Sequence, residues 1–192
     1  MLNTILGSLS SGVAASTSSF ESIATVTATG GESSLAFTSI PGTYKHLQLR
    51  YIARNQSTAA AFSSTPILTL NNDSALNYAD HYLQGNGSAA SAVGSAGGNN
   101  GIQLAATSLR NTSTAGIFGV CIVDIIDYAS TTKNKTVRYF GGVDTNTADT
   151  AWRVTLGSGL WLSTTAVTSL EIYPGASTWL AGSTFALYGI KG

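Results

Sequence analysis

Two histidines and several carboxylates are the residues of this chain whose types could support acid–base chemistry. His81 follows Asp80, and an acid–base dyad needs a carboxylate that orients the imidazole, with a nucleophile within hydrogen-bond reach. Adjacent strand residues point to opposite faces, so Asp80 cannot orient His81. No G-x-S-x-G elbow or other nucleophile motif accompanies His81 or His46. The sequence therefore predicts that the protein is not an enzyme and that these histidines lie at a surface or an interface.

Asp124 and Asp127 flank Ile125 and Ile126 at the end of the most apolar run in the chain. Carboxylates placed there need partners. The basic residues that follow after one turn are Lys133, Lys135 and Arg138. We expect them to pair with the two carboxylates across a hairpin. The spacing of the carboxylates puts them on opposite faces of a continuing strand, which argues against a shared metal.

Two further groups of residues could bind a ligand. Residues 144–149 contain oxygen ligands suited to calcium but lack the Gly and the terminal Glu of a calcium hand, so we expect a solvated loop. Aromatic side chains could line a sugar-binding groove, although such residues in a β-sandwich are more often core or interface anchors. These aromatic residues are Trp152, Trp161, Trp179, Tyr173 and Tyr188. We expect no cofactor and no metal.

Charged residues are scarce, with nine Lys or Arg and nine Asp or Glu among 192 residues and a net charge of zero. Nucleic-acid binding requires a basic footprint, which these scattered and balanced charges do not supply. No stretch is long and apolar enough to sit in a membrane. We therefore expect neither nucleic acid nor membrane as a partner. A neutral surface rich in Ser and Thr suits a protein packed among other proteins, because its contacts bury no charged side chain without a partner.

The sequence divides into a short N-terminal arm, residues 1–19, and a single β-domain, residues 20–192. In the arm, Leu2, Ile5, Leu6 and Leu9 recur at spacings that would make one apolar stripe on a short helix. The arm lacks the positive region of a secretion signal. A stripe of this length is marginally stable alone in water, so it would become ordered only by docking on its own domain or on a partner. The alternative is a frayed terminus. We expect the stripe to dock on a neighbouring protein. These four residues are our candidate attachment interface.

From residue 21 onward, short β-rich runs are separated by clusters of Gly, Pro, Asn and Asp. We expect strands at 22–29, 34–40, 46–54, 67–70, 79–84, 102–109, 117–128, 135–141, 152–156, 160–162, 167–173 and 184–190. We expect residues 85–101, mostly Gly, Ser, Ala and Asn, to form a long flexible loop. Many short strands without an internal repeat predict an all-β fold, an antiparallel β-sandwich of jelly-roll type.

The alternation of apolar residues predicts which side chains enter the core. Residues 121–126 are more continuously apolar, as in a strand that is buried on both faces or lies under a neighbouring subunit. Cys121, the only cysteine, can make no disulfide within the chain and is expected to pack as a small core residue. The other side chains assigned to the core are those of Leu47, Leu49, Tyr51, Phe185 and Leu187.

Four phrases, in their order along the chain, carry a resemblance to a known family. Together they resemble small virion structural proteins of tailed bacteriophages. The resemblance implies a component of the particle rather than an enzyme, and it carries no catalytic residues. The phrases are FESIATVTATGGESSLAFTSIPGTYKHLQLRYIAR (residues 20–54), VDIIDYASTTKNKTVRYFGG (123–142), SGLWLSTTAVTSLEIYP (158–174) and FALYGIKG (185–192).

Three classes of function follow from these features. A capsid decoration or cement protein is short, neutral, all-β and oligomeric, with an arm that reaches onto the shell. A tail fibre or receptor-binding tail tip, the alternative, would carry a longer fibrous N-terminal portion. A carbohydrate-active enzyme would need paired carboxylates in a groove. We predict a capsid decoration protein on the outer surface of the virion, a homo-oligomer, expected to be a trimer, that binds other virion proteins such as the major capsid protein. We expect the stripe of the arm to dock on a neighbouring virion protein.

Overall fold

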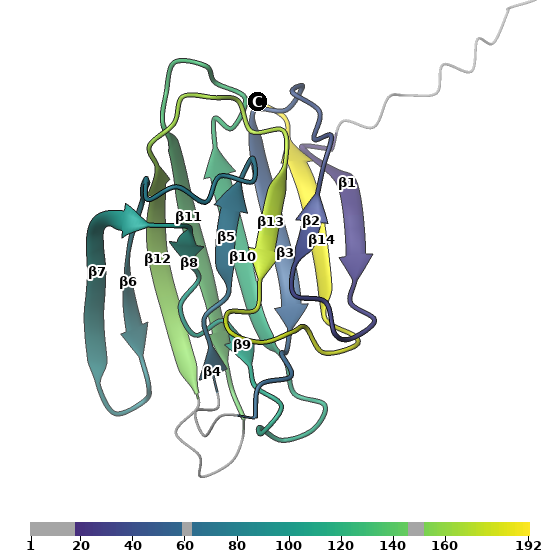
Figure 1. The fold of residues 1–192 in the computed structure, drawn as a ribbon, viewed down its shortest axis with the longest axis vertical. Coiled ribbons are helices and arrows are strands. Elements are labelled where there is room, and N and C mark those ends of the chain that lie inside the picture. Colours follow the sequence, from purple (N-terminus) through teal and green to yellow (C-terminus); the bar gives the residue numbers. More distant parts are fainter. Residues whose placement is uncertain (1–17, 59–62, 146–151) are drawn as a thin grey trace, which may run out of the picture.

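The structure is a computed structural model that describes residues 18–58, 63–145 and 152–192. Two antiparallel sheets pack face to face, which confirms the predicted all-β sandwich (Figure 1). The larger sheet contains, in spatial order, β1 (Phe20–Thr27), β14 (Thr184–Ile190), β3 (His46–Ala53), β10 (Gly119–Ile126), β11 (Lys135–Val143), β12 (Arg153–Trp161), β6 (Tyr78–Gly85) and β7 (Ala90–Asn99). The smaller sheet contains β2 (Leu35–Phe37), β13 (Leu170–Tyr173), β5 (Ile67–Leu70) and β8 (Ile102–Gln103). Strands β4 (Ser63–Ser64) and β9 (Ser108–Leu109) form a short separate pair.

The core lies between the two sheets and is built from alternate residues of each strand. Its largest members include an aromatic group in which the Phe185 ring lies 5.3 Å from that of Tyr51 and 4.9 Å from that of Trp179. Cys121 is 2% exposed and carries a free thiol, as predicted. The predicted core residues Leu47, Leu49, Tyr51, Phe185 and Leu187 are all buried.

The prediction of a long loop at residues 85–101 is wrong. After a turn at residues 86–89, the chain forms β7, which pairs with β6 along the edge of the larger sheet. The side chain of Asn86 accepts hydrogen bonds from the backbone N–H groups of Ser88 and Ala89, which fixes the turn. Backbone pairing holds the edge strand in place, so its small side chains need not fill a core.

The prediction of two separate strands, at 152–156 and 160–162, is also wrong. The structure has one continuous strand, β12, in which Gly157 and Gly159 face the core. A side chain at either position would collide with the Tyr139 ring or with Ile102. These glycines therefore permit close packing and do not end the strand. Conversely, the strand expected at 102–109 is interrupted by a turn in which Ala106 adopts a φ of 51°.

Candidate binding face of the larger sheet

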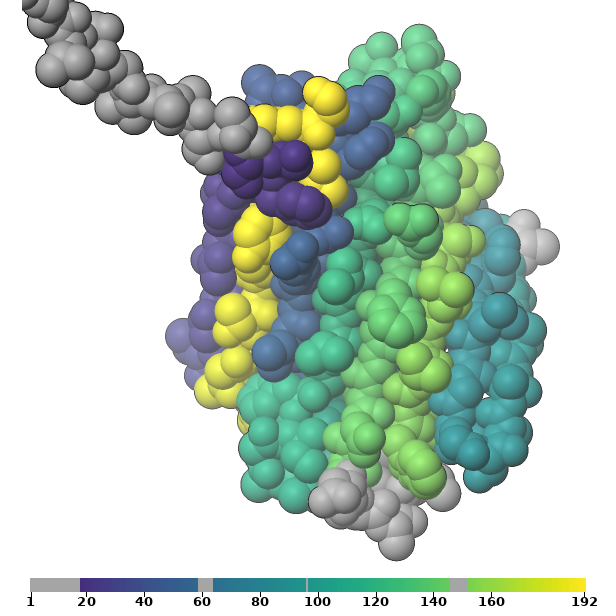
Figure 2. All heavy atoms as spheres, turned by 180° about the vertical axis from the view of Figure 1, so that it is seen from behind, coloured from purple at the N-terminus to yellow at the C-terminus, as the bar shows by residue number. Residues whose placement is uncertain are grey.

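Figure 2 shows the outer face of the larger sheet. Exposed large apolar side chains on adjacent strands of this face form what we call the apolar face. Each of its side chains is between 42% and 60% exposed. The residues lie on five adjacent strands, from β3 across β10, β11 and β12 to β6. The apolar face consists of Ile52, Leu83, Val120, Ile122, Phe140, Val154 and Leu156.

Strand register arranges these side chains in two rows. In one row, Ile122 is opposite Phe140, which is opposite Leu156 and then Leu83. In the other row, Ile52 is opposite Val120, and Gly142 separates Val120 from Val154. Because Gly142 has no side chain, the face is hollowed there.

The hollow has a volume of about 540 Å³. Its walls include Val120, Ile122, Phe140 and Val154, together with Arg50 at one side. Almost all of this lining is carbon. The arrangement can accept protruding apolar side chains of a protein segment.

Polar residues on the same outer face are satisfied by one another. The side chain of Gln48 donates to Asp124 Oδ1 (2.7 Å), and Arg138 Nη2 donates to Asp124 Oδ2 (3.1 Å). Arg50 Nε donates to Gln48 Oε1 (2.6 Å). The Arg50 guanidinium also lies over the rings of Phe20 and Tyr188, at 5.5 and 5.2 Å from their centroids. The charges beside the apolar face therefore have partners already, which lowers the cost of covering them.

The alternation of β10 explains how the apolar face forms. Cys121, Val123 and Ile125 point into the core, so Val120 and Ile122 must point outward. The interpretation that this run is buried on both faces is therefore wrong for the described residues. The alternative, that it lies under a neighbouring subunit, stays a prediction. The continuous apolar run was the sequence signal for this face, whereas its members on β11, β12 and β6 were missed.

The structure separates the residues first considered for acid–base chemistry. Asp80 is buried and accepts hydrogen bonds from the Asn99 side chain and the Gln103 backbone N–H (3.0 and 3.1 Å). His81 points to the opposite, exposed face, as predicted. His46 accepts a hydrogen bond at Nδ1 from the Asp127 backbone N–H (3.0 Å). Neither histidine is paired with a nucleophile by any contact among the described residues.

The predicted pairing of acids and bases is confirmed for Asp124 with Arg138 and for Asp127 with Lys133 (3.1 and 2.6 Å). Asp127 also lies 2.9 Å from Lys45 Nζ. The hydrogen bonds from Lys133 and then Lys45 lower the pKa of Asp127 to about 2.

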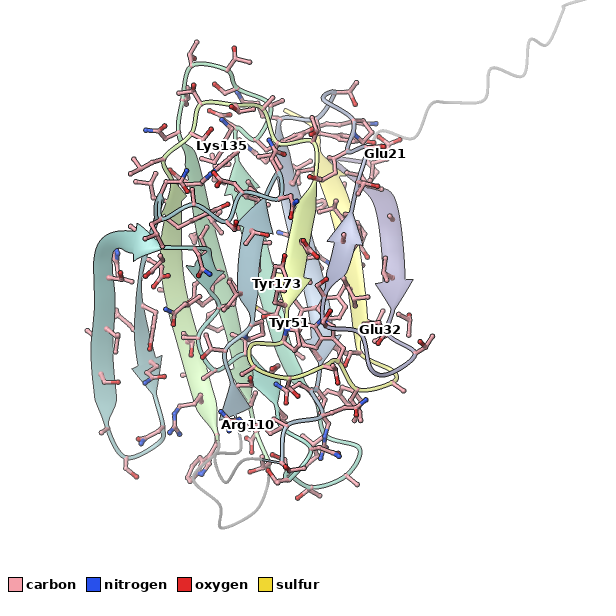
Figure 3. All side chains as sticks on the ribbon, in the orientation of Figure 1. Glu21, Glu32, Tyr51, Arg110, Lys135 and Tyr173 are labelled. Carbon is pink, nitrogen blue, oxygen red and sulfur yellow. The ribbon has the colours of Figure 1, made fainter. Side chains whose placement is uncertain are left out.

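For Lys135 the predicted pairing with a carboxylate is wrong. Its side chain is fully buried at the same end of the sandwich as Glu21 (Figure 3). The ammonium donates to the backbone carbonyls of Ser130 and Lys133 (2.8 and 2.7 Å), so it closes the turn between β10 and β11. Burial lowers the pKa of Lys135.

The aromatic residues considered for a sugar-binding groove are dispersed. Trp179 and Trp161 are buried, and Trp161 Nε1 donates to Asp73 (2.7 Å). Trp152 is partly exposed and directly precedes the first residue of β12. Tyr188 lies beside Arg50 on the outer face. The core interpretation is therefore confirmed for the two buried tryptophans.

Other sequence expectations fall partly or wholly outside the described residues. The candidate attachment residues Leu2, Ile5, Leu6 and Leu9 lie outside them, as does most of the 144–149 segment. Across residues 18–58, 63–145 and 152–192, no group of three or more His, Cys, Asp or Glu could hold a metal ion. In the same ranges no helix has the length and apolarity needed to cross a membrane. No protein-family model matches the chain, and a search of curated proteins finds no significant match.

Proposed function

We propose that this protein is a structural component of a bacteriophage virion, a decoration or cement protein that binds the assembled capsid as a homotrimer. The observation that carries the proposal is the apolar face. Seven half-exposed side chains make a patch on the order of 600 Å², as large as the largest patches found on monomers. In a chain with so few charges, this face is suited to lie against another protein.

The size of the apolar face is adequate for a subunit contact. Standard protein interfaces bury about 800 Å² on each partner, and their centres are apolar and poor in charge. The apolar face supplies most of that area, and the bonded group of Gln48, Asp124 and Arg138 supplies a polar rim. The resemblance of the four sequence phrases to virion proteins provides the context for such a contact.

We further propose that the sandwich is a jelly roll. Numbered one to eight along the chain, the strands that support this are β1, β2, β3, β5, β8, β10, β13 and β14. Part of the larger sheet then has the order 1-8-3-6, and the smaller sheet has the order 2-7-4-5. This order corresponds to the two interlocked Greek keys of a jelly roll, an architecture used by viral capsid proteins and lectins. Strands β11, β12, β6 and β7 would extend one of its sheets.

Imaging of phage particles that carry a labelled copy of the chain tests the proposal. A decoration protein places the label in a regular array over the capsid shell. A label confined to the tail would replace the proposal with the tail-fibre or tail-tip alternative, and particles without label would overturn both.

A further inference from the structure

We propose that residues 2–9 of the chain are the occupant of the apolar face, with Leu2, Ile5, Leu6 and Leu9 seated in and around its hollow. The inference deepens the proposed function, because it names the segment that covers the face and joins copies of the chain. The same contact can close on the chain's own face in a monomer and on a neighbour's face in an oligomer, as in domain swapping.

The chain enters the described structure beside this face. Phe20, the first residue of β1, is on the outer side of the larger sheet, since it is opposite Ile190, which is opposite His46. Its ring lies 5.5 Å from the Arg50 guanidinium, and Arg50 is one of the residues that line the hollow. Ser19 continues past the end of β14, where its carbonyl accepts a hydrogen bond from the Lys191 backbone N–H (3.0 Å). The residues before Ser19 must therefore turn back to cover the apolar face.

The reach of the chain fits the distance it must cover. From Phe20 the hollow lies three strands away and four to six residues along β3, which is about 20–25 Å at ordinary strand spacing and rise. Residues 10–17, when extended, span about 26–29 Å. A short helix over residues 2–9 would be about 12 Å long, which corresponds to between two and three strand spacings. Ser18 and Ser19 lead away from the hollow and add about 7 Å to this distance. The stripe thus reaches the hollow when residues 10–17 turn back and are nearly fully extended.

The chemistry of the two partners also agrees. Residues 1–19 contain no charged side chain, so docking them buries no unpaired charged side chain. On a helix the four large side chains of the stripe would protrude from one face, and the hollow over Gly142 is open to receive them. A flat sheet of another subunit laid over this face would instead leave the hollow empty, and the side chains that line it would lose van der Waals contacts.

Disulfide trapping in the purified full-length chain tests this contact without any particle. In a Cys121→Ala background, Leu6→Cys is combined with Ile122→Cys on the apolar face. The matched control combines Leu6→Cys with Ala36→Cys, because Ala36 is exposed on the opposite side of the sandwich. Disulfide formation in a glutathione buffer is followed on non-reducing gels, which separate links within a chain from links between chains.

We expect the pair with Ile122→Cys to form its disulfide at least about tenfold faster than the control, since docking raises the effective concentration of the two thiols. Links within one chain or between two chains both support the contact. Equal rates for the two pairs, or no disulfide at either, would overturn it. The result is independent of particle imaging, so failure of the contact and failure of the virion role are distinguishable.

The same contact can be tested without new cysteines. The variant with Leu2, Ile5, Leu6 and Leu9 all replaced by Ser should bind an apolar dye several-fold more strongly than the wild type, because its apolar face is left open. Unchanged dye binding would contradict the proposal.

Discussion

The ring of Tyr139 occupies the space in which a side chain at residue 157 would begin. A Cβ on Gly157 would lie 2.2 Å from Tyr139 Cζ, well inside any permitted contact. The ring cannot easily withdraw, because Tyr139 is buried and its hydroxyl accepts a hydrogen bond from the Ala105 backbone N–H (3.2 Å). Tyr139 and Gly157 are opposite each other on β11 and β12, directly beside the pair of Phe140 and Leu156 on the outer face.

Gly157→Ala should therefore lower the free energy of unfolding by about 1–3 kcal/mol, the usual cost of overpacking a core. Chemical denaturation followed by tryptophan fluorescence measures this change. Gly42→Ala is the matched control, since a Cβ added at Gly42 would meet no atom within 4 Å. Equal stability of the two variants would show that Tyr139 moves freely.

Lys135→Met removes a buried ammonium and leaves the carbonyls of Ser130 and Lys133 without their donor. We expect a loss of about 1–3 kcal/mol in the free energy of unfolding, typical of buried polar groups left unsatisfied. Lys133→Met, which removes an exposed ion pair with Asp127, should cost no more than about 1 kcal/mol. A larger loss for Lys133→Met than for Lys135→Met would contradict this account.

The pKa of Asp127, lowered to about 2, predicts how stability changes in acid. Because this pKa lies below the unfolded value of about 3.9, the ionised carboxylate stabilises the fold above about pH 4, and this contribution is lost between about pH 4 and pH 2. The wild type and Asp127→Asn should therefore differ most above pH 5 and converge near pH 2. Asn is the suitable replacement because it tolerates the positive φ of 47° at this position. Urea midpoints across this range test the prediction, and a constant difference would refute it.

The strands and core were largely predictable from sequence, because alternation reports burial directly. Leu47, Leu49 and Tyr51 illustrate this on β3. The role of each glycine could not be predicted from sequence. The same residue type ends a strand in one context and permits close packing in another, as at Gly157. The apolar face could not be assembled from sequence. Its members are separated along the chain, and only strand register brings Phe140 beside Ile122 and Leu156.

Self-association is expected for the wild-type chain, with sedimentation equilibrium giving the mass of a trimer. Leu156→Glu, which places a charge in the middle of the apolar face, should shift the equilibrium toward monomer. The control Leu162→Glu alters a similarly exposed leucine just beyond the end of β12 and should leave the mass unchanged. A wild-type chain that stays monomeric at the highest concentration would exclude the homotrimer.

The most direct test of the central claim, that the apolar face is the contact surface of the assembled protein, is the occupancy of phage particles that lack the native copy. The double variant Ile122→Ser, Phe140→Ser removes two side chains that are 42% and 56% exposed, so it should stay folded. Loss of their burial at the contact corresponds to about 2 kcal/mol, or roughly thirtyfold weaker binding. The account predicts that loss for the double variant and normal occupancy for Leu162→Ser, whereas a folded double variant that decorates particles as well as the wild type would contradict it.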